Sequence, residues 1–197
     1  DDGTSQTLSV IRKQAGGTWS AADVLWTGAE PGNTLPTPGA WVDATGTATV
    51  VWRQPAAGGT WDLVAARAAE GAAWSAPEVL RANAGLGPTL VRGTPDGDVL
   101  VVYRRHSGKV EAVRYAGSWG EPELVGAADP AVKDLAAAVD PGGRAVALFS
   151  PQAGGLGAGV VSRVMTPGGV WRPAVMLLPS GQKIARGSLQ AGAGHDD

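Results

Sequence analysis

An internal repeat of about fifty residues constrains the fold of this chain more than any other feature. The segment LSVIRKQAGGTWSAADVL, residues 8–25, aligns without a gap on LVAARAAEGAAWSAPEVL, residues 63–80. Two related segments, VEAVRYAGSWGEPELV and VVSRVMTPGGVWRPAVML, begin at Val110 and Val160. Every copy contains an arginine, a short glycine-rich turn and a tryptophan; the arginines are Arg12, Arg67, Arg114 and Arg163, and the tryptophans are Trp19, Trp74, Trp119 and Trp171.

A second repeated unit lies between these copies. The segments GTATVVWR, GDVLVVYR and GRAVALFS each begin at a turn glycine and place an aromatic residue at the same offset from it. The turns DATG, PDG and DPGG supply the backbone conformations that tight hairpins require. The whole unit therefore predicts a strand, a tight turn, a strand with an aromatic residue, a loop, a strand ending in arginine, a glycine turn with tryptophan, and a short strand. The three aromatic residues are Trp52, Tyr103 and Phe149.

Four short strands per unit are typical of the blades of a β-propeller. We therefore expect an all-β fold, a β-propeller of about four blades or a fragment of a larger propeller, with four-stranded antiparallel blades. We expect one domain over residues 1–197, with units at about 29–82, 83–126 and 127–180 and a split unit made of 181–197 and 1–28. An irregular β-sandwich is the alternative, but a sandwich would not require turns and aromatic residues to recur in register.

The two ends of the chain predict how the ring closes. The chain begins with the third strand of a unit, and GSLQAGAG near its other end resembles a first strand. We expect these segments to pair and complete one blade. The second strand of that blade is missing from both ends, so either the split blade has three strands or the chain is an excerpt from a larger ring.

Composition excludes several classes of partner and cofactor. The formal net charge is −2, and the 16 Lys and Arg residues are scattered along the sequence, so we expect no nucleic acid partner. No apolar run approaches the length that spans a bilayer. The absence of cysteine excludes disulfides and thiolate metal sites. Few Lys residues among abundant Ala, Gly and Arg indicate a bacterial source, and we expect a secreted or cell-surface location.

The turn between the third and fourth strands resembles the Asp-box, S-x-D-x-G-x-x-W, of sialidase-like (BNR) propellers. Counted back from their tryptophans, Gly16 and Gly71 occupy the glycine position of the box. The serine position holds arginine in both copies, and the aspartate position holds Gln14 and Ala69, so the boxes are degenerate. The resemblance implies the blade architecture and not an activity, because the box is structural in that family.

The same resemblance implies the catalytic set that a hydrolase of this family would need: three arginines, a tyrosine with a glutamate partner, and an aspartic acid. Here only Tyr103 and Tyr115 could serve as the nucleophile. Tyr103 occupies the repeated aromatic position and is expected in the core, and Glu111 is the candidate partner of Tyr115. The regular recurrence of the arginines favours packing on aromatic faces within the blades instead.

Other catalytic and metal sites are not expected. His106 and His195 lack metal-ligand spacing, and His106 is expected in a solvated turn. The starting DDG and the final HDD would gather carboxylates at a closed ring, where Ca²⁺ is one interpretation and frayed ends are the other. We assign no catalytic residue, no metal ligand and no cofactor.

Three tryptophans fall outside the repeated positions: Trp26, Trp41 and Trp61. We take them as the candidate ligand-binding residues, because the repeated tryptophans are explained by wedging between sheets. Trp41 lies on a first strand, where the corresponding residue of another unit is Ala138. It either fills the channel or floors a pocket at its mouth.

The leading interpretation of function is a non-catalytic extracellular recognition module, for which a glycan or a surface protein is the candidate partner. A fragment of a sialidase-like glycoside hydrolase is the first alternative. A structural or assembly domain of a larger surface protein is the second. The sequence does not specify the oligomeric state.

Overall fold

The computed structural model describes residues 5–14, 16–29, 37–126, 132–151, 159–178 and 191. Strands dominate this part of the chain, and one short 3-10 turn is its only helical element. The elements are β1 (Ser5–Val10), β2 (Asp23–Ala29), β3 (Gly39–Val42), β4 (Ala48–Ala56), η1 (Ala57–Gly59), β5 (Thr60–Ala68), β6 (Glu78–Arg81), β7 (Thr89–Gly93), β8 (Val99–Arg104), β9 (Val110–Tyr115), β10 (Glu123–Gly126), β11 (Val132–Val139), β12 (Ala145–Pro151), β13 (Val160–Met165) and β14 (Val175–Leu178).

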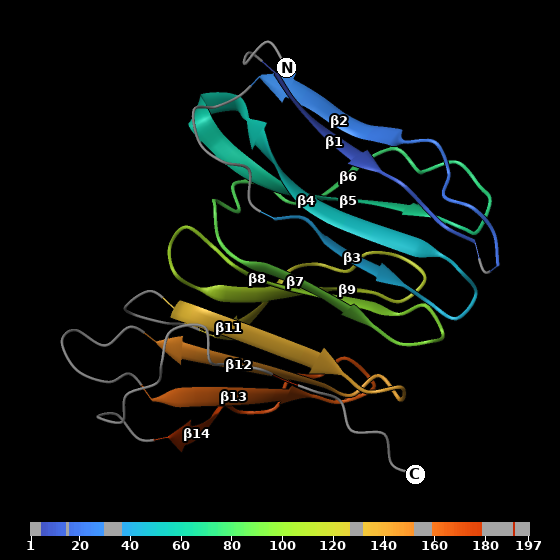
Figure 1. The fold of residues 1–197 in the computed structure, drawn as a ribbon. Helices are drawn as coiled ribbons and strands as arrows, with labels where there is room; N and C mark the ends of the chain where they lie inside the picture. Colours follow the sequence, from blue (N-terminus) through green and yellow to red (C-terminus); the bar gives the residue numbers. More distant parts are fainter. Residues whose placement is uncertain are drawn as a thin grey trace.

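The strands form one two-stranded sheet, β1–β2, and three four-stranded sheets, β3–β6, β7–β10 and β11–β14. All neighbouring strands are antiparallel and consecutive in sequence. Figure 1 shows the four sheets stacked face to face in chain order, as successive blades of a propeller. We call them the first to the fourth blade. The all-β expectation is confirmed, and the β-sandwich alternative is wrong because the strands do not form two sheets.

Each four-stranded blade follows the strand order that the repeats predict. First strands (β3, β7, β11) lead by a tight turn into aromatic-bearing second strands (β4, β8, β12), followed by third strands (β5, β9, β13) and short fourth strands (β6, β10, β14). The first blade contributes a third strand, β1, and a fourth strand, β2. Ring closure stays a prediction, since GSLQAGAG lies outside the described residues except for Ala191.

Positive φ angles at the turn glycines explain why the units share these residues. Gly46, Gly97 and Gly143 have φ values of 80°, 96° and 81° between the first and second strands. Only glycine adopts this left-handed conformation without steric cost. The glycines therefore set where each hairpin reverses, and with it the register of the second strand.

A large aromatic ring from each second strand packs into the interface with the preceding blade. Trp52, Tyr103 and Phe149 are 3%, 0% and 3% exposed. Each ring belongs to an apolar cluster that includes residues of the blade before it. The expectation that Tyr103 is a core residue is confirmed.

Two of the repeated arginines reach from one blade into the next. The guanidinium of Arg12 lies 5.1 Å from the ring centroid of Trp74 and donates a hydrogen bond to the carbonyl oxygen of Ala72 at 2.8 Å. The guanidinium of Arg67 lies 3.7 Å from the ring centroid of Tyr115. The predicted packing of arginine on aromatic faces is confirmed for these two residues.

The arginine of the fourth blade is not equivalent to the others. In the third blade, Arg114 on β9 pairs with Leu100 on β8. The residue at the same place in the fourth blade is Val164 on β13, so Arg163 comes one residue earlier in its strand than Arg114 does. Because successive side chains of a strand point to opposite faces, this shift turns Arg163 back toward the third blade. There it donates to the carbonyl oxygen of Leu124 at 2.8 Å. The four-fold equivalence that the sequence predicted is therefore wrong in the last copy.

The repeated tryptophans also differ with their place in the stack. Trp74 is half-buried, and its indole N–H donates to the Asp23 carboxylate of the preceding blade at 3.2 Å. Trp19 belongs to the first blade, which has no described sheet on its outer side, and it is 62% exposed. The predicted wedging between sheets is confirmed for Trp74 and wrong for Trp19.

We predict that Trp52→Ala lowers the free energy of unfolding by about 3–5 kcal/mol, because it removes a buried ring from the interface of two blades. The control is Trp19→Ala, which removes an exposed ring and should change stability by no more than about 0.5 kcal/mol. Urea unfolding measures both variants. Equal losses would contradict the burial of Trp52 between the blades.

Candidate functional site

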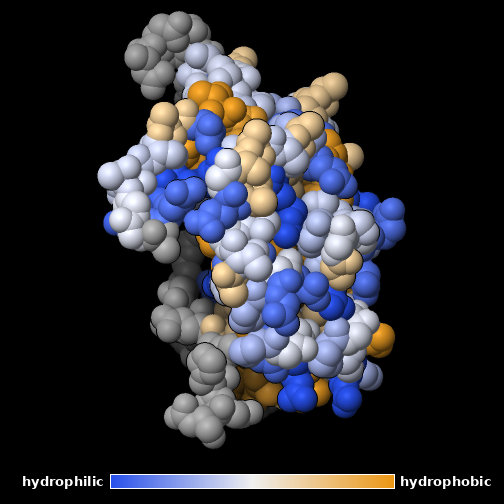
Figure 2. All heavy atoms as spheres, turned by 90° about the vertical axis from the view of Figure 1, so that its right-hand side faces the viewer, coloured by the Kyte–Doolittle hydropathy of each residue, from blue (hydrophilic) through white to orange (hydrophobic). Residues whose placement is uncertain are grey.

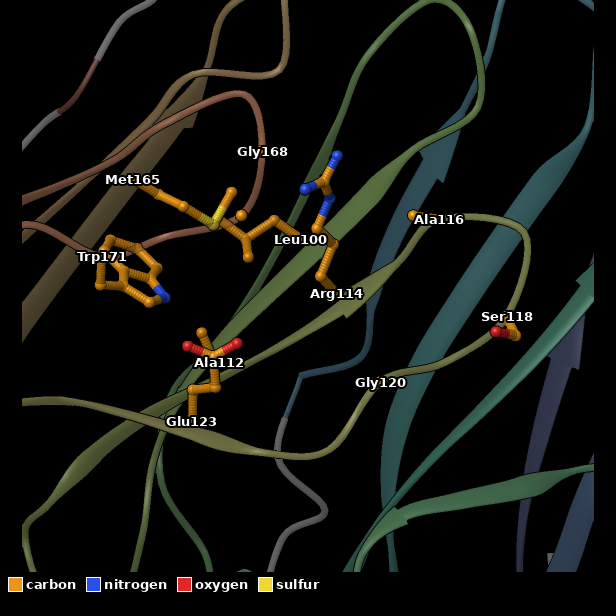
Figure 3. Close-up of a pocket in the computed structure, with 11 residues that line it drawn as sticks. Leu100, Ala112, Arg114, Ala116, Ser118, Gly120, Glu123, Met165, Gly168 and Trp171 are labelled. Carbon is orange, nitrogen blue, oxygen red and sulfur yellow. The ribbon is translucent and has the colours of Figure 1, made fainter.

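A cavity of about 310 Å³ opens between the third and fourth blades. We call it the inter-blade groove. Its walls come from β8, β9 and the turn after β9 on one side, and from the end of β13 and the turn after it on the other. Figure 3 shows the lining residues, which are Leu100, Ala112, Arg114, Ala116, Ser118, Gly120, Glu123, Met165, Gly168, Gly169 and Trp171.

The groove lies near the end of the blades where the tight turns gather. The turns after the first and third strands lie at the right of Figure 1 and face the viewer in Figure 2. The surface in that view is largely hydrophilic, with scattered apolar residues. A ligand in the groove would therefore meet a polar rim around a partly apolar interior.

The corresponding junctions between the other blades are occupied by arginine on an aromatic ring. Between the second and third blades, Arg67 covers the ring of Tyr115. In the fourth blade the position of Tyr115 is held by Met165, because Tyr115 lies opposite Val99 and Met165 lies opposite the matching Ala145. Arg114 thus has no tyrosine ring to cover at this junction.

An ion pair holds that guanidinium within its own blade. Arg114 Nη2 lies 2.5 Å from Asp98 Oδ2, where Asp98 directly precedes β8 of the same blade. The turn of the fourth blade approaches from the other side, since a Cβ on Gly169 would lie 2.8 Å from Arg114 Nη1. Glycine at this position leaves room for the guanidinium. The groove therefore lies at a junction where methionine stands in the place of tyrosine and Arg114 is paired within its own blade.

The groove combines an aromatic ring with groups that donate and accept hydrogen bonds. Trp171 is half-buried, Glu123 and Ser118 are exposed, and Arg114 is half-buried. Trp171 and Met165 come from the fourth blade, opposite Arg114 and Glu123 of the third (Figure 3). An apolar surface with a few convergent polar groups is typical of small-molecule sites. Glu123 is the only carboxylate among the described lining residues.

The three tryptophans proposed from the sequence do not line this groove. Trp61 is 7% exposed, which leaves its ring little surface for a ligand. Trp26 is half-buried, and its ring lies against the backbone of Gly28. Trp26 packs in the cluster between the first and second blades, so the structure does not bring these rings together.

Trp41 packs between the first strands of the second and third blades. It is half-buried, and a Cβ on Gly93 would lie 2.6 Å from its Nε1. Its equivalence to Ala138 is confirmed by register, since the two residues lie opposite Thr49 and Val146 at matching positions of the second strands. Binding of a ligand by Trp26, Trp41 and Trp61 stays a prediction.

The sequence did not indicate which residues line the groove. Trp171 belongs to the repeated tryptophans, which the repeat explains as structural. Met165 becomes notable only when the strand register shows that it occupies the position of Tyr115 in the preceding blade. The available signal was the shift of Arg163 against the other arginines, which marks the last interface as different.

Glu111, the expected partner of Tyr115, is hydrogen-bonded to Tyr103 instead. The hydroxyl of Tyr103 donates to Glu111 Oε2 at 2.8 Å. Tyr115 instead packs edge to face on Trp119, with ring centroids 5.3 Å apart. Tyr115 lies four residues along β9 from Glu111, a separation of roughly 13 Å on a strand. The predicted partnership of Tyr115 with Glu111 is therefore wrong.

Burial makes Tyr103 a poor nucleophile. The residue is 0% exposed, and burial together with the hydrogen bond to Glu111 raises the pKa of its hydroxyl far above the usual range. The guanidinium of Arg53 lies 5.7 Å from the Tyr103 ring centroid. Burial lowers the pKa of Arg53 to about 10, so Arg53 remains charged at neutral pH. This cluster is a packed element of the interface between the second and third blades.

The described part of the chain contains no group of three or more His, Asp or Glu residues that could hold a metal ion. His106 is exposed in its turn, as expected. The acidic ends considered for Ca²⁺ lie outside the described residues. Among the described residues no helix is long and apolar enough to cross a membrane.

No protein-family model matches the chain, and no curated protein matches it. The resemblance to Asp-box repeats therefore stays a prediction. Among solved structures, the α-L-arabinofuranosidase PaAbf62A from Podospora anserina in complex with cellotriose is similar at 13% identity and a TM-score of 0.42, over 75% of this chain and 52% of that chain. A GH62 hydrolase in complex with xylotriose is similar at 16% identity and a TM-score of 0.42, over 75% of this chain and 52% of that chain.

A protein of unknown function from Dyadobacter fermentans is similar at 13% identity and a TM-score of 0.34, over 87% of this chain and 72% of that chain. The chain spans about half the length of the two hydrolases, at 52% of each. These identities and TM-scores carry neither an activity nor a ligand over to this chain.

We predict that Tyr103→Phe lowers the free energy of unfolding by about 1.5–3 kcal/mol, because it removes a buried hydrogen bond to a charged carboxylate. Tyr115→Phe is the matched control, since the Tyr115 hydroxyl forms no hydrogen bond with a described residue, and it should change stability by no more than about 0.5 kcal/mol. Urea unfolding of both variants checks the difference. An equal effect of the two substitutions would contradict the role given to the Tyr103 hydroxyl.

Proposed function

We propose that this chain is a non-catalytic extracellular recognition module that binds a glycan in the inter-blade groove. The observation that carries the proposal is the groove itself, which is open where the equivalent junction between the second and third blades is closed by arginine on an aromatic ring. The repeat alone does not require this opening. The proposal also takes residues 1–197 as one domain of four units, one of them split between the two ends.

The chemistry of the groove suits a sugar. A pyranose ring has an apolar C–H face that packs on an aromatic ring, which Trp171 supplies. Its hydroxyl groups both donate and accept hydrogen bonds. The carboxylate of Glu123 accepts them, the guanidinium of Arg114 donates them, and the hydroxyl of Ser118 does both.

The ligand should leave the groove unaltered. Hydrolysis of a glycosidic bond by the usual route uses two carboxyl groups on either side of the bond, and Glu123 is the only carboxylate among the described lining residues. Binding should be weak, because a short groove with one aromatic ring offers few contacts to offset the entropy lost on association. These features favour recognition over the hydrolase alternative.

A second candidate function is assembly with a neighbouring protein. The outer side of the first blade exposes Ile11, Trp19 and Val24 at 53%, 62% and 61%. Apolar side chains gathered at one end of a stack of sheets are typical of surfaces that pack against another chain. Self-association that rises with concentration in the absence of any glycan would favour this function.

We predict that Trp171→Ala weakens the binding of a glycan found by array screening by about tenfold or more, because it removes the aromatic floor of the groove. Titration calorimetry measures the affinity, and urea unfolding verifies that the variant is folded. Trp19→Ala is the matched control, because Trp19 is exposed and does not line the groove.

Two results would contradict the proposal. One is a folded Trp171→Ala variant that binds as tightly as the unchanged protein. The other is release of monosaccharide from the bound glycan, which would move the protein to the hydrolase class.

A further inference from the structure

We propose a second binding site, for the sulfate group of a sulfated glycan, at the opposite end of the third blade from the inter-blade groove. It is formed by Arg81 at the end of β6 and by Arg105, His106 and Lys109 in the loop between β8 and β9. We call these four residues the basic patch. This loop precedes β9, whereas the groove residues Ala116 to Gly120 follow it, so the two sites lie at different ends of that strand.

Two guanidiniums from different blades converge on one carboxylate. Arg81 Nε lies 3.4 Å from Glu111 Oε2, and Arg105 Nη1 lies 3.2 Å from Glu111 Oε1. Arg81 belongs to the second blade, while Arg105 and Glu111 belong to the third. The shared carboxylate therefore holds the two cationic side chains close to one another across the interface.

The carboxylate does not balance the positive charge around it. Arg53, which is 2% exposed, lies beneath the same cluster against the Tyr103 ring. Its guanidinium donates hydrogen bonds to Thr89 Oγ1 and to the carbonyl oxygen of Arg104, each at 3.1 Å, and to the carbonyl oxygen of Gly85. It forms no ion pair with a described carboxylate. Two guanidiniums thus share Glu111, and the buried Arg53 adds a third positive charge beneath them.

Two other carboxylates lie on these strands, Asp62 on β5 and Glu78 at the start of β6, and neither forms an ion pair with Arg81 or Arg105. Asp62 accepts a hydrogen bond from the backbone N–H of Asn83 at 2.9 Å. The region consequently carries an excess of positive charge, although the whole chain has a net charge of −2. An anion bound there would lower the repulsion between the guanidiniums.

A ligand can reach the patch from solvent. The side chains of Arg81 and Arg105 are 34% and 25% exposed, and His106 and Lys109 are exposed. Glu111 is 7% exposed and lies inside, so it orients the two arginines without occupying the surface. The buried pairing fixes guanidiniums that would otherwise be mobile, which reduces the entropy lost on binding.

The geometry favours a single sulfate over an extended polyanion. Guanidinium groups bind oxyanions through paired N–H donors, and a sulfate has enough oxygens to accept from two of them at once. Nucleic acid carries a charge about every 1.7 Å and needs basic residues along a longer surface. Here the basic residues gather at one loop and one strand end. Sequence reasoning missed the patch because Arg81 is distant in the chain from the loop.

The test uses the whole chain with two probes, inorganic sulfate and a sulfated oligosaccharide, followed by NMR chemical shifts and by calorimetry at low and physiological ionic strength. We expect the oligosaccharide to bind and to shift the amide signals of residues 105–109. Arg81→Gln should weaken binding by about tenfold or more. Arg105→Lys, which keeps the charge and loses the planar donor pair, should weaken it less than Arg81→Gln.

Arg144→Gln is the matched control, since Arg144 is an exposed arginine in a tight turn at the other end of the blades. It should leave binding unchanged. The proposal is overturned if a folded Arg81→Gln variant binds as the unchanged protein does, or if Arg144→Gln weakens binding equally. Tighter binding of single-stranded DNA or of a carboxylated oligosaccharide of matched length would overturn the assignment to sulfate.

Discussion

Each blade after the first is held to the one before it by a large aromatic ring from its second strand. The side chains of a strand alternate between two faces, so the residues on either side of the ring point toward the following blade. Val51 and Val102, next to Trp52 and Tyr103, are each 0% exposed. The second strand of a blade thus contributes side chains to the interfaces with both neighbouring blades. Repetition of this one pattern of residues builds the stack of sheets.

The same alternation makes the stack sensitive to register. A shift of one residue moves a side chain from one interface to the other, as the contrast between Arg114 and Arg163 shows. Arg163 binds carbonyl oxygens of the third blade, and a valine takes the position at which arginine reaches forward in earlier copies. The fourth blade therefore meets its neighbour differently, and the open groove lies at that interface.

The sequence predicted the features that depend on local patterns. Turn glycines and alternating apolar residues specified the strands, their order and the burial of Tyr103. It could not specify which junctions would be filled, because that depends on pairs of residues distant in the chain, such as Arg114 and Met165. It also gave Glu111 the wrong partner, since Tyr103 on the adjacent strand is closer to it than Tyr115 on its own strand.

We infer that the groove is open because Met165 stands, at the junction of the third and fourth blades, in the position that Tyr115 holds in the preceding blade. The Met165→Tyr variant tests it most directly, because it restores the residue that Arg67 covers in the preceding interface. Filling the cavity should raise the free energy of unfolding by about 0.5–2 kcal/mol, and glycan affinity measured by calorimetry should fall by about tenfold or more. A variant with unchanged stability and unchanged glycan affinity would contradict the account.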